Sequence, residues 1–114
     1  MNDAELLTCL AERAVSHETD PETDRTILLR PRYGSGWWGR LLTRRLADPH
    51  VRVHLDELGT WVWARLDGSV RLDEIAHEMR SAFPDEPKPE QRLLMFVRQL
   101  VGTGLIRLRR AAGT

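Results

Sequence analysis

The chain has 114 residues, of which 30% are charged and 41% hydrophobic, and its formal net charge at pH 7 is zero. This length suits one domain with a modest core, and the single cysteine, Cys9, excludes an internal disulfide and favours a reducing compartment. No apolar run is long enough to span a membrane and no signal-peptide pattern opens the chain, so we expect a soluble, cytoplasmic protein.

The first 24 residues predict a short amphipathic helix followed by an acidic linker. Apolar residues between Leu6 and Val15 recur at helical spacing, which favours a helix from about residue 3 to residue 15. Residues 16–24 are polar and acidic and contain Pro21, which is typical of a mobile linker. A helix this short is marginal alone in water, so we expect it to lie on this domain, on a second copy in a homodimer, or on another protein.

Charge is unevenly distributed between this N-terminal stretch and the one that follows it. Residues 1–24 hold seven acidic side chains against Arg13, whereas residues 25–52 hold seven arginines against Asp48. The two stretches could attract each other, or the basic one could meet a partner.

The basic stretch predicts one strand and one helix. Thr26 to Arg30 is typical of a strand, and Pro31 stops it. The arginines and leucines between Trp37 and Ala47 fit an amphipathic helix better than a strand. We expect Trp37 and Trp38 to be packing residues rather than an aromatic pair that grips a peptide.

The next stretch predicts a strand that runs directly into a helix. From Val51 to Leu55, aliphatic residues alternate with Arg52 and His54, which is the period of a strand with one buried face. Apolar residues between residues 58 and 66 then recur at helical spacing, and Gly68 is expected to take the left-handed conformation that ends this helix.

Two more helices, a last strand and a frayed tail complete the chain. The second helix ends before Pro84, and the third runs from about Glu90 to Val101. A strand is expected from Leu105 to Leu108, and residues 109–114 are expected to form a flexible tail. The predicted buried faces are Leu72, Ile75, Ala76, Met79 and Phe83 of the second helix, and Leu93, Phe96, Val97 and Leu100 of the third.

These elements together predict an α+β, mainly α fold. We expect a winged helix-turn-helix, in which a three-helix bundle carries a small antiparallel β-sheet, plus an N-terminal amphipathic helix. The predicted division is residues 1–24 for the helix and linker, 25–108 for the winged-helix domain, and 109–114 for the tail.

Seven short motifs follow one another in a set order between residues 51 and 108. They are Leu55-Asp56-Glu57, Gly59, Val62-Trp63, Asp67-Gly68, Leu72-Asp73-Glu74-Ile75-Ala76, Phe83, and the segment from Leu100 to Leu105-Ile106. In this order and spacing the chain resembles the PqqD-like family, whose small winged-helix domains recognise precursor peptides in pathways to ribosomally made, modified peptides. The segment from Trp37 to Ala47 departs from the family pattern, which has a strand there.

The resemblance implies a non-catalytic peptide chaperone. Such a protein binds the leader of a precursor peptide by adding it as a strand to a sheet edge, and presents it to a modifying enzyme such as a radical-SAM enzyme. The leader would lie between the edge strand and the third helix. The implied peptide-binding residues are Val51, Arg52, Val53, His54 and Leu55 on the strand, and Arg92, Leu94, Met95 and Arg98 on the helix.

Side chains must contribute to such binding, because each hydrogen bond nets about 1 kcal/mol while ordering one flexible residue costs roughly 1 to 2 kcal/mol. Leu94 and Met95 could line an apolar groove, and Arg92 and Arg98 could pair with leader acids. The plainer reading makes the first two the rim of the core and the arginines solvated surface. Replacing Val53 by proline is expected to remove one donor from the edge.

Other classes of function are weaker on sequence grounds. No combination of nucleophile, histidine and carboxylate follows a recognisable motif, so we expect no enzyme activity, no cofactor and no metal. A winged-helix DNA-binding regulator is the main alternative, but acidic residues such as Asp73, Glu74 and Glu90 would face phosphates and make nucleic acid binding unfavourable. A scaffold or dimerisation subunit that binds no peptide is a further alternative.

Overall fold

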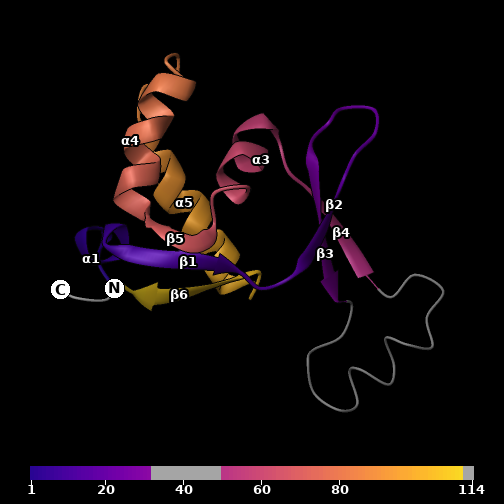
Figure 1. The fold of residues 1–114 in the computed structure, drawn as a ribbon, viewed down its shortest axis with the longest axis horizontal. Helices are drawn as coiled ribbons and strands as arrows, with labels where there is room; N and C mark the ends of the chain where they lie inside the picture. Colours follow the sequence, from indigo (N-terminus) through magenta and orange to yellow (C-terminus); the bar gives the residue numbers. More distant parts are fainter. Residues whose placement is uncertain (32–49, 112–114) are drawn as a thin grey trace, which may run out of the picture. The chain divides into compact units, whose positions relative to one another are not determined.

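The computed structural model describes residues 1–31 and 50–111. The segment Trp37–Ala47, for which a helix and two packing tryptophans are expected, lies outside the described residues. Within them the chain forms four helices and six strands, which Figure 1 shows in sequence colours. In chain order these are α1 (Asp3–Leu7), β1 (Cys9–Arg13), β2 (Ser16–Thr19), β3 (Thr26–Pro31), β4 (His50–His54), α3 (Glu57–Trp63), β5 (Asp67–Arg71), α4 (Leu72–Ala82), α5 (Pro89–Gly102) and β6 (Ile106–Arg110).

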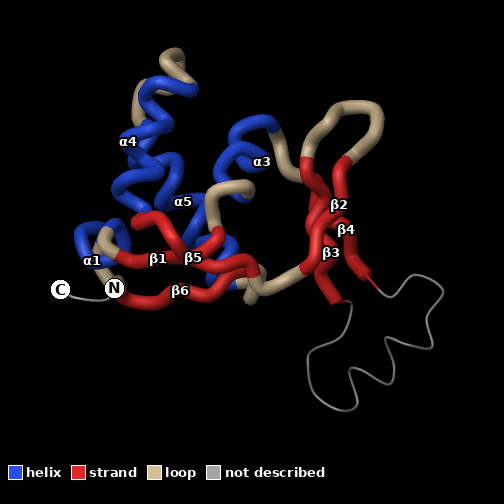
Figure 2. The backbone as a smooth tube through the Cα atoms, viewed as in Figure 1, coloured by secondary structure: helices blue, strands red, loops and turns tan. Residues whose placement is uncertain are grey.

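The elements fall into two compact units, each with its own sheet. Unit 1 consists of Met1–Ala14 together with Glu57–Thr114, and unit 2 is Val15–Asp56. Each of the helices in the described residues belongs to unit 1, and the described part of unit 2 is built of strands and loops, which Figure 2 colours red and tan.

Unit 1 is built around an antiparallel sheet in the order β5-β1-β6. The central strand, β1, is short but is bonded on both sides: the Arg13 N–H donates to the Leu66 carbonyl and the Ala14 N–H to the Leu105 carbonyl, each at 3.0 Å. Helices α4 and α5 pack on each other, α4 also packs on β1 and β5, and α5 also packs on β6. The strands β5 and β6, which lie far along the chain, therefore both depend on β1, near the N-terminus, for their backbone pairing.

The apolar stripes of α4 and α5 form part of the core of unit 1, which also contains the fully buried Trp63 of α3. The predicted stripe of α4 is confirmed, since Leu72, Ile75, Ala76 and Met79 are buried, while Phe83, the residue that caps the helix, is half-buried. On α5 the stripe is shifted slightly from the prediction. Its buried members are Leu93, Leu94, Val97 and Leu100, and Phe96 is only half-buried.

Unit 2 is an antiparallel sheet in the order β2-β3-β4. A tight turn joins β2 to β3: the Asp24 N–H donates to the Asp20 carbonyl at 2.8 Å, and Asp24 has a positive φ of 63°. A short aspartate tolerates this conformation better than a branched residue would. The strand expected from Thr26 to Arg30 is confirmed as β3, and Leu28 at its centre is fully buried.

The predicted fold class is wrong. The described residues are about 40% helical and 32% strand, and they form two small three-stranded antiparallel sheets rather than a mainly α three-helix bundle of winged helix-turn-helix type. The helices were predicted because their apolar residues recur at a clear helical spacing. The strands of four or five residues were missed because they are too short to give a strong alternating signal.

The N-terminal helix and the acidic linker were also predicted wrongly. The helix ends at Leu7, where the Thr8 N–H bonds back to the Glu5 carbonyl at 3.2 Å, and residues 9–13 form β1. Residues 16–19 form β2 instead of a linker. The helical spacing in residues 6–15 arises because consecutive residues of β1 are buried on both faces, which erases the strand period.

Two further boundaries differ from the prediction. Gly68 does have a positive φ, of 81°, but it lies in β5. The helix α3 ends at Trp63, five residues earlier, and Ala64 follows in a turn. The last strand, β6, includes Arg109 and Arg110, which were assigned to a flexible tail. The alternation of Ile106 and Leu108 with arginines is the signal that indicates this longer strand.

Candidate peptide-binding edge

The strand β4 is an edge strand of the sheet in unit 2. Within the described residues it pairs with β3 alone, in the register that places Val53 opposite Leu28 and Arg52 opposite Leu29. An edge strand leaves one row of backbone N–H and C=O groups without a ladder partner, and another extended chain can bond to that row.

One hydrogen bond determines which residues of β4 face the open edge. The Leu55 N–H donates to the Thr26 carbonyl at 3.0 Å, so these two residues form a hydrogen-bonded pair. In an antiparallel ladder such pairs alternate with pairs that do not bond. Val53 and Val51 therefore bond toward β3, and the backbone groups of His50, Arg52 and His54 point away from it.

This geometry corrects the expectation for Val53. Its N–H faces Leu28 inside the sheet, so a proline at this position would remove a ladder bond rather than an edge donor. The outward N–H donors belong to His50, Arg52 and His54, which alternate with the aliphatic residues of the strand. The correction could not come from the sequence, because it depends on the register of β4 against β3.

The side chains of β4 divide between the two faces of the sheet. Val51, Val53 and Leu55 share one face, on which Leu55 is buried, Val53 half-buried and Val51 39% exposed. Arg52 and His54 are exposed on the other face, where the Arg52 guanidinium pairs with the Glu18 carboxylate across the central strand. A peptide strand added to β4 would therefore contact apolar side chains on one face of the sheet and polar side chains on the other.

His54 also borders a small hollow in unit 2. The hollow has a volume of about 120 Å³, and Asp20, Arg25 and Ile27 are among the residues that line it together with His54.

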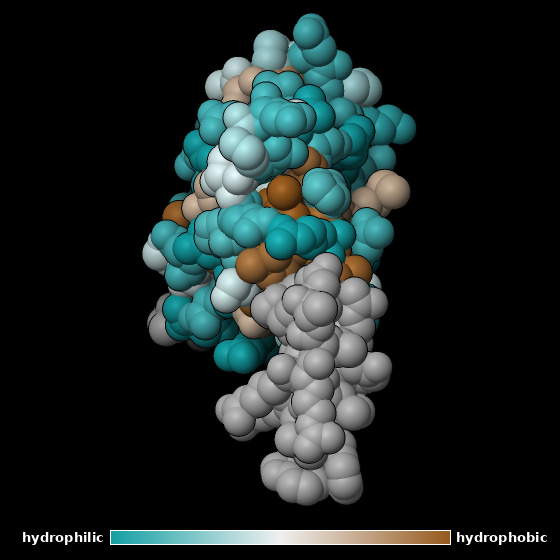
Figure 3. All heavy atoms as spheres, turned by 90° about the vertical axis from the view of Figure 1, so that its right-hand side faces the viewer, coloured by the Kyte–Doolittle hydropathy of each residue, from teal (hydrophilic) through white to brown (hydrophobic). Residues whose placement is uncertain are grey.

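In Figure 3 hydrophilic side chains cover most of the described face that is shown, and apolar atoms reach the surface in a limited area only.

The four predicted positions on the third helix have different environments. Leu94 is buried, with 4% of its surface exposed, so it belongs to the core, whereas Met95 is 70% exposed. The Arg98 guanidinium bonds to the Asp3 carboxylate at 2.7 Å, and that of Arg92 lies 3.4 Å from the Glu86 carboxylate. These positions belong to unit 1 and β4 belongs to unit 2, so a shared groove stays a prediction.

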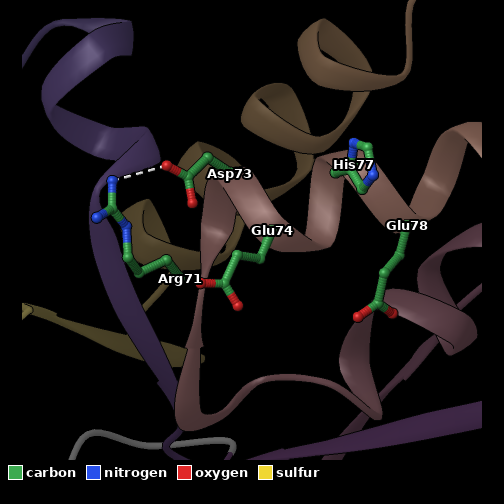
Figure 4. Close-up of a pocket in the computed structure, with 5 residues that line it drawn as sticks. All are labelled: Arg71, Asp73, Glu74, His77 and Glu78. Atoms are coloured by element: carbon green, nitrogen blue, oxygen red, sulfur yellow. Dashed lines mark hydrogen bonds and ion pairs between the residues drawn. The ribbon is translucent and has the colours of Figure 1, made fainter.

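An open hollow of about 490 Å³ beside α4 is lined by polar side chains of the kinds that occur in catalytic sites. Figure 4 shows Arg71 and Asp73 pointing toward one another, 2.7 Å apart, while Glu74, His77 and Glu78 follow along α4. His77 is exposed, as expected for a surface residue. Among residues 1–31 and 50–111, no group of three or more His, Cys, Asp and Glu side chains is placed to hold a metal ion.

In the described part of the chain, none of the helices is both long and apolar enough to cross a membrane. No curated protein and no solved structure matched the chain significantly. A family model described as coenzyme PQQ synthesis protein D matches residues 39–106, which is more than half of the chain and includes β4, α3, α4 and α5. The chain therefore belongs to the PqqD family, whose role lies in the biosynthesis of PQQ and related modified peptides.

Proposed function

We propose that this PqqD family protein is a non-catalytic peptide chaperone that binds the leader of a precursor peptide as an added strand on β4. The observation that carries the proposal is the outward row of backbone groups on His50, Arg52 and His54, at an edge that within the described residues pairs on one side only. The leader would then be presented to a modifying enzyme, which performs the chemistry.

The side chains of β4 add to the binding free energy that backbone pairing supplies. A leader with aliphatic residues on one face would contact the exposed part of Val51 and the half-buried Val53, and each buried methylene contributes about 0.8 kcal/mol. This contribution is needed because backbone hydrogen bonds alone, at about 1 kcal/mol each, do not offset the cost of ordering a flexible chain. On α5, Arg92, Met95 and Arg98 are the exposed members of the predicted set, and their contact with the leader stays a prediction.

A proline at His54 tests this proposal with little damage to the sheet. The His54 N–H points outward, so proline removes an edge donor and adds a ring there while the bonds between β4 and β3 stay intact. We expect calorimetry with a synthetic leader peptide to show affinity lower by about tenfold, which corresponds to about 1.4 kcal/mol. Arg52→Pro should act in the same direction.

Two controls separate the edge from other effects. His54→Ala removes the side chain and keeps the backbone donor, so it should leave the affinity within about twofold of the original. Val53→Pro should instead unfold unit 2, because it breaks a bond inside the sheet. If His54→Pro binds the leader as tightly as the unchanged protein, β4 is not the binding edge. Tight, salt-sensitive binding to duplex DNA would favour the regulator alternative instead.

A further inference from the structure

The strand β6 is a second sheet edge, and it lies in unit 1. It pairs with β1, and within the described residues no other strand bonds to it. The Ala14 N–H donates to the Leu105 carbonyl, so the bonded pairs that follow join Glu12 to Arg107 and Leu10 to Arg109. The backbone groups of Ile106, Leu108 and Arg110 consequently point away from β1, toward the open side.

An apolar groove of about 400 Å³ adjoins this edge. The half-buried Leu108 lines it from β6, and Val101, which is 39% exposed, lines it from α5. The complete lining is Met1, Leu6, Arg98, Val101, Gly102 and Leu108. All six residues belong to unit 1, so the groove is defined inside one compact unit.

Polar contacts join two walls of the groove. The Arg98 guanidinium donates to the Asp3 carboxylate at 2.7 Å and to the Met1 carbonyl at 3.3 Å, which holds the N-terminal segment against α5. Met1 is nevertheless 57% exposed, so an apolar surface stays open to solvent there. An edge next to an accessible apolar groove has the two components that strand addition requires.

The charges along β6 indicate the chemistry of the partner. Arg109 is engaged by the Glu12 carboxylate at 3.2 Å and the Gly68 carbonyl at 2.7 Å. Arg107 and Arg110 are exposed, and no acidic side chain of the described residues forms an ion pair with them. Arg107 lies on the face opposite to that of Leu108, whereas Arg110 shares the Leu108 face. A strand that joins this edge would gain from acidic residues beside Arg107 and from one acid beside Arg110, at the end of its aliphatic face.

We infer that the β6 edge and its groove form a docking site for an acidic, extended segment of a partner protein. Side chains of that segment on the Leu108 face would be aliphatic and enter the groove, and those on the Arg107 face would be acidic. A second copy of this chain fits less well, because pairing β6 with itself would bring arginines opposite arginines. Its strand edge is not the one proposed on β4, and Arg98 is the one residue that belongs both to this groove and to the predicted leader-binding set.

Gly102 provides a direct test. It lines the groove, a Cβ there would meet nothing within 4 Å, and it has no positive φ, so larger residues are accommodated at the end of α5. Gly102→Phe should fill part of the groove, and Gly102→Ala is its matched control. The probe is a short synthetic peptide in which glutamate alternates with valine and leucine, added to the full chain and followed by NMR.

The expected result is a set of amide shift changes centred on Ile106, Leu108 and Val101. Gly102→Phe should weaken the binding by about tenfold or more, Gly102→Ala should change it by less than about twofold, and Arg107→Glu together with Arg110→Glu should weaken it strongly. Raising the salt concentration should weaken it too. His54→Pro should leave this binding unchanged, which separates it from the leader site.

Three outcomes would overturn the inference. The first is a lack of shift changes on β6 with saturating peptide, and the second is equal affinity of Gly102→Phe and the unchanged chain. The third is equal binding of a peptide with lysine in place of glutamate, which would remove the argument from charge. A concentration-dependent dimer that Gly102→Phe abolishes would instead assign the groove to a second copy of the chain.

Discussion

Gly68 is the residue at which backbone conformation and packing most narrowly restrict the side chain. Its φ is 81°, and a Cβ would lie 2.6 Å from the Glu12 Cγ. We expect Gly68→Ala to lower the free energy of unfolding by about 1 to 3 kcal/mol, measured by chemical denaturation. Gly104→Ala, where φ is 74° but no atom lies within 4 Å, should cost only about 1 kcal/mol, and Gly102→Ala nothing. Equal losses at all three would contradict this account.

Asp67, next to that glycine, is the residue with a shifted acidity. The Ser69 hydroxyl donates to the carboxylate at 2.6 Å, and this bond, with a second from the Ser69 N–H, holds the pKa of Asp67 below its usual 3.8. We expect Ser69→Ala to raise that pKa, as measured by NMR titration, because the stronger of the two donors is lost. A pKa that does not rise would show that the backbone donor is sufficient.

The sign of the pH dependence follows from the same contacts. Because the folded state lowers the pKa, the contribution of Asp67 to stability is complete above its unfolded value, near 3.9, and is lost as the pH falls through the folded value. The dependence of stability on pH through Asp67 is therefore confined to acid conditions, and small pH changes near neutrality leave the contribution unchanged.

At the scale of elements, α5 illustrates how neighbouring residues on one helix have different tasks. Leu94 is 4% exposed and Met95 70% exposed. We expect Leu94→Ala to lower the free energy of unfolding by about 2 to 5 kcal/mol, because it opens a cavity, and Met95→Ala to change it by less than about 0.5 kcal/mol. Thermal denaturation of the two variants tests this difference in stability. A large loss at Met95 would mean that its side chain packs on something within the folded chain.

Helices with a clear period were predictable, and elements that bury both faces were not. The stripe of α4 follows from helical spacing alone, since only one side of that helix is covered. In β1, by contrast, Cys9, Leu10 and Ala11 are all buried, so their run has no strand period and resembles part of a helix. The length of α1 was overestimated for this reason.

At the scale of the whole molecule, the missed information is the pairing of distant segments. β1 bonds to residues 67–71 and 106–110, and no local pattern in residues 9–13 identifies these partners. Among the described residues, the attraction between the acidic and the basic stretch is seen where Glu18 pairs with Arg52 inside unit 2. Asp3 and Glu12 find their arginines in α5 and β6 instead.

The strand that carries the candidate site was predictable from the sequence, and the accessibility of its individual residues was not. The alternation from Val51 to Leu55 correctly indicated a strand, and the structure places that strand at an edge within the described residues. Which of its residues offer outward donors depends on a register set by β3, and which residues of α5 are accessible depends on how the core is filled. Leu94 is buried, in agreement with the core alternative, and the expected effect of proline at Val53 was wrong, while Met95 and Arg52 are exposed.

The central position of β1 has a practical consequence for anyone who shortens this protein. The family match begins at residue 39, which invites expression of the matching segment alone. Such a fragment would lack the strand to which both β5 and β6 bond, and it would expose two unpaired backbone rows and the apolar interior beneath them. Fragments of that kind tend to aggregate. Studies of this chain should therefore keep its first residues, even though they lie outside the segment by which its family is recognised.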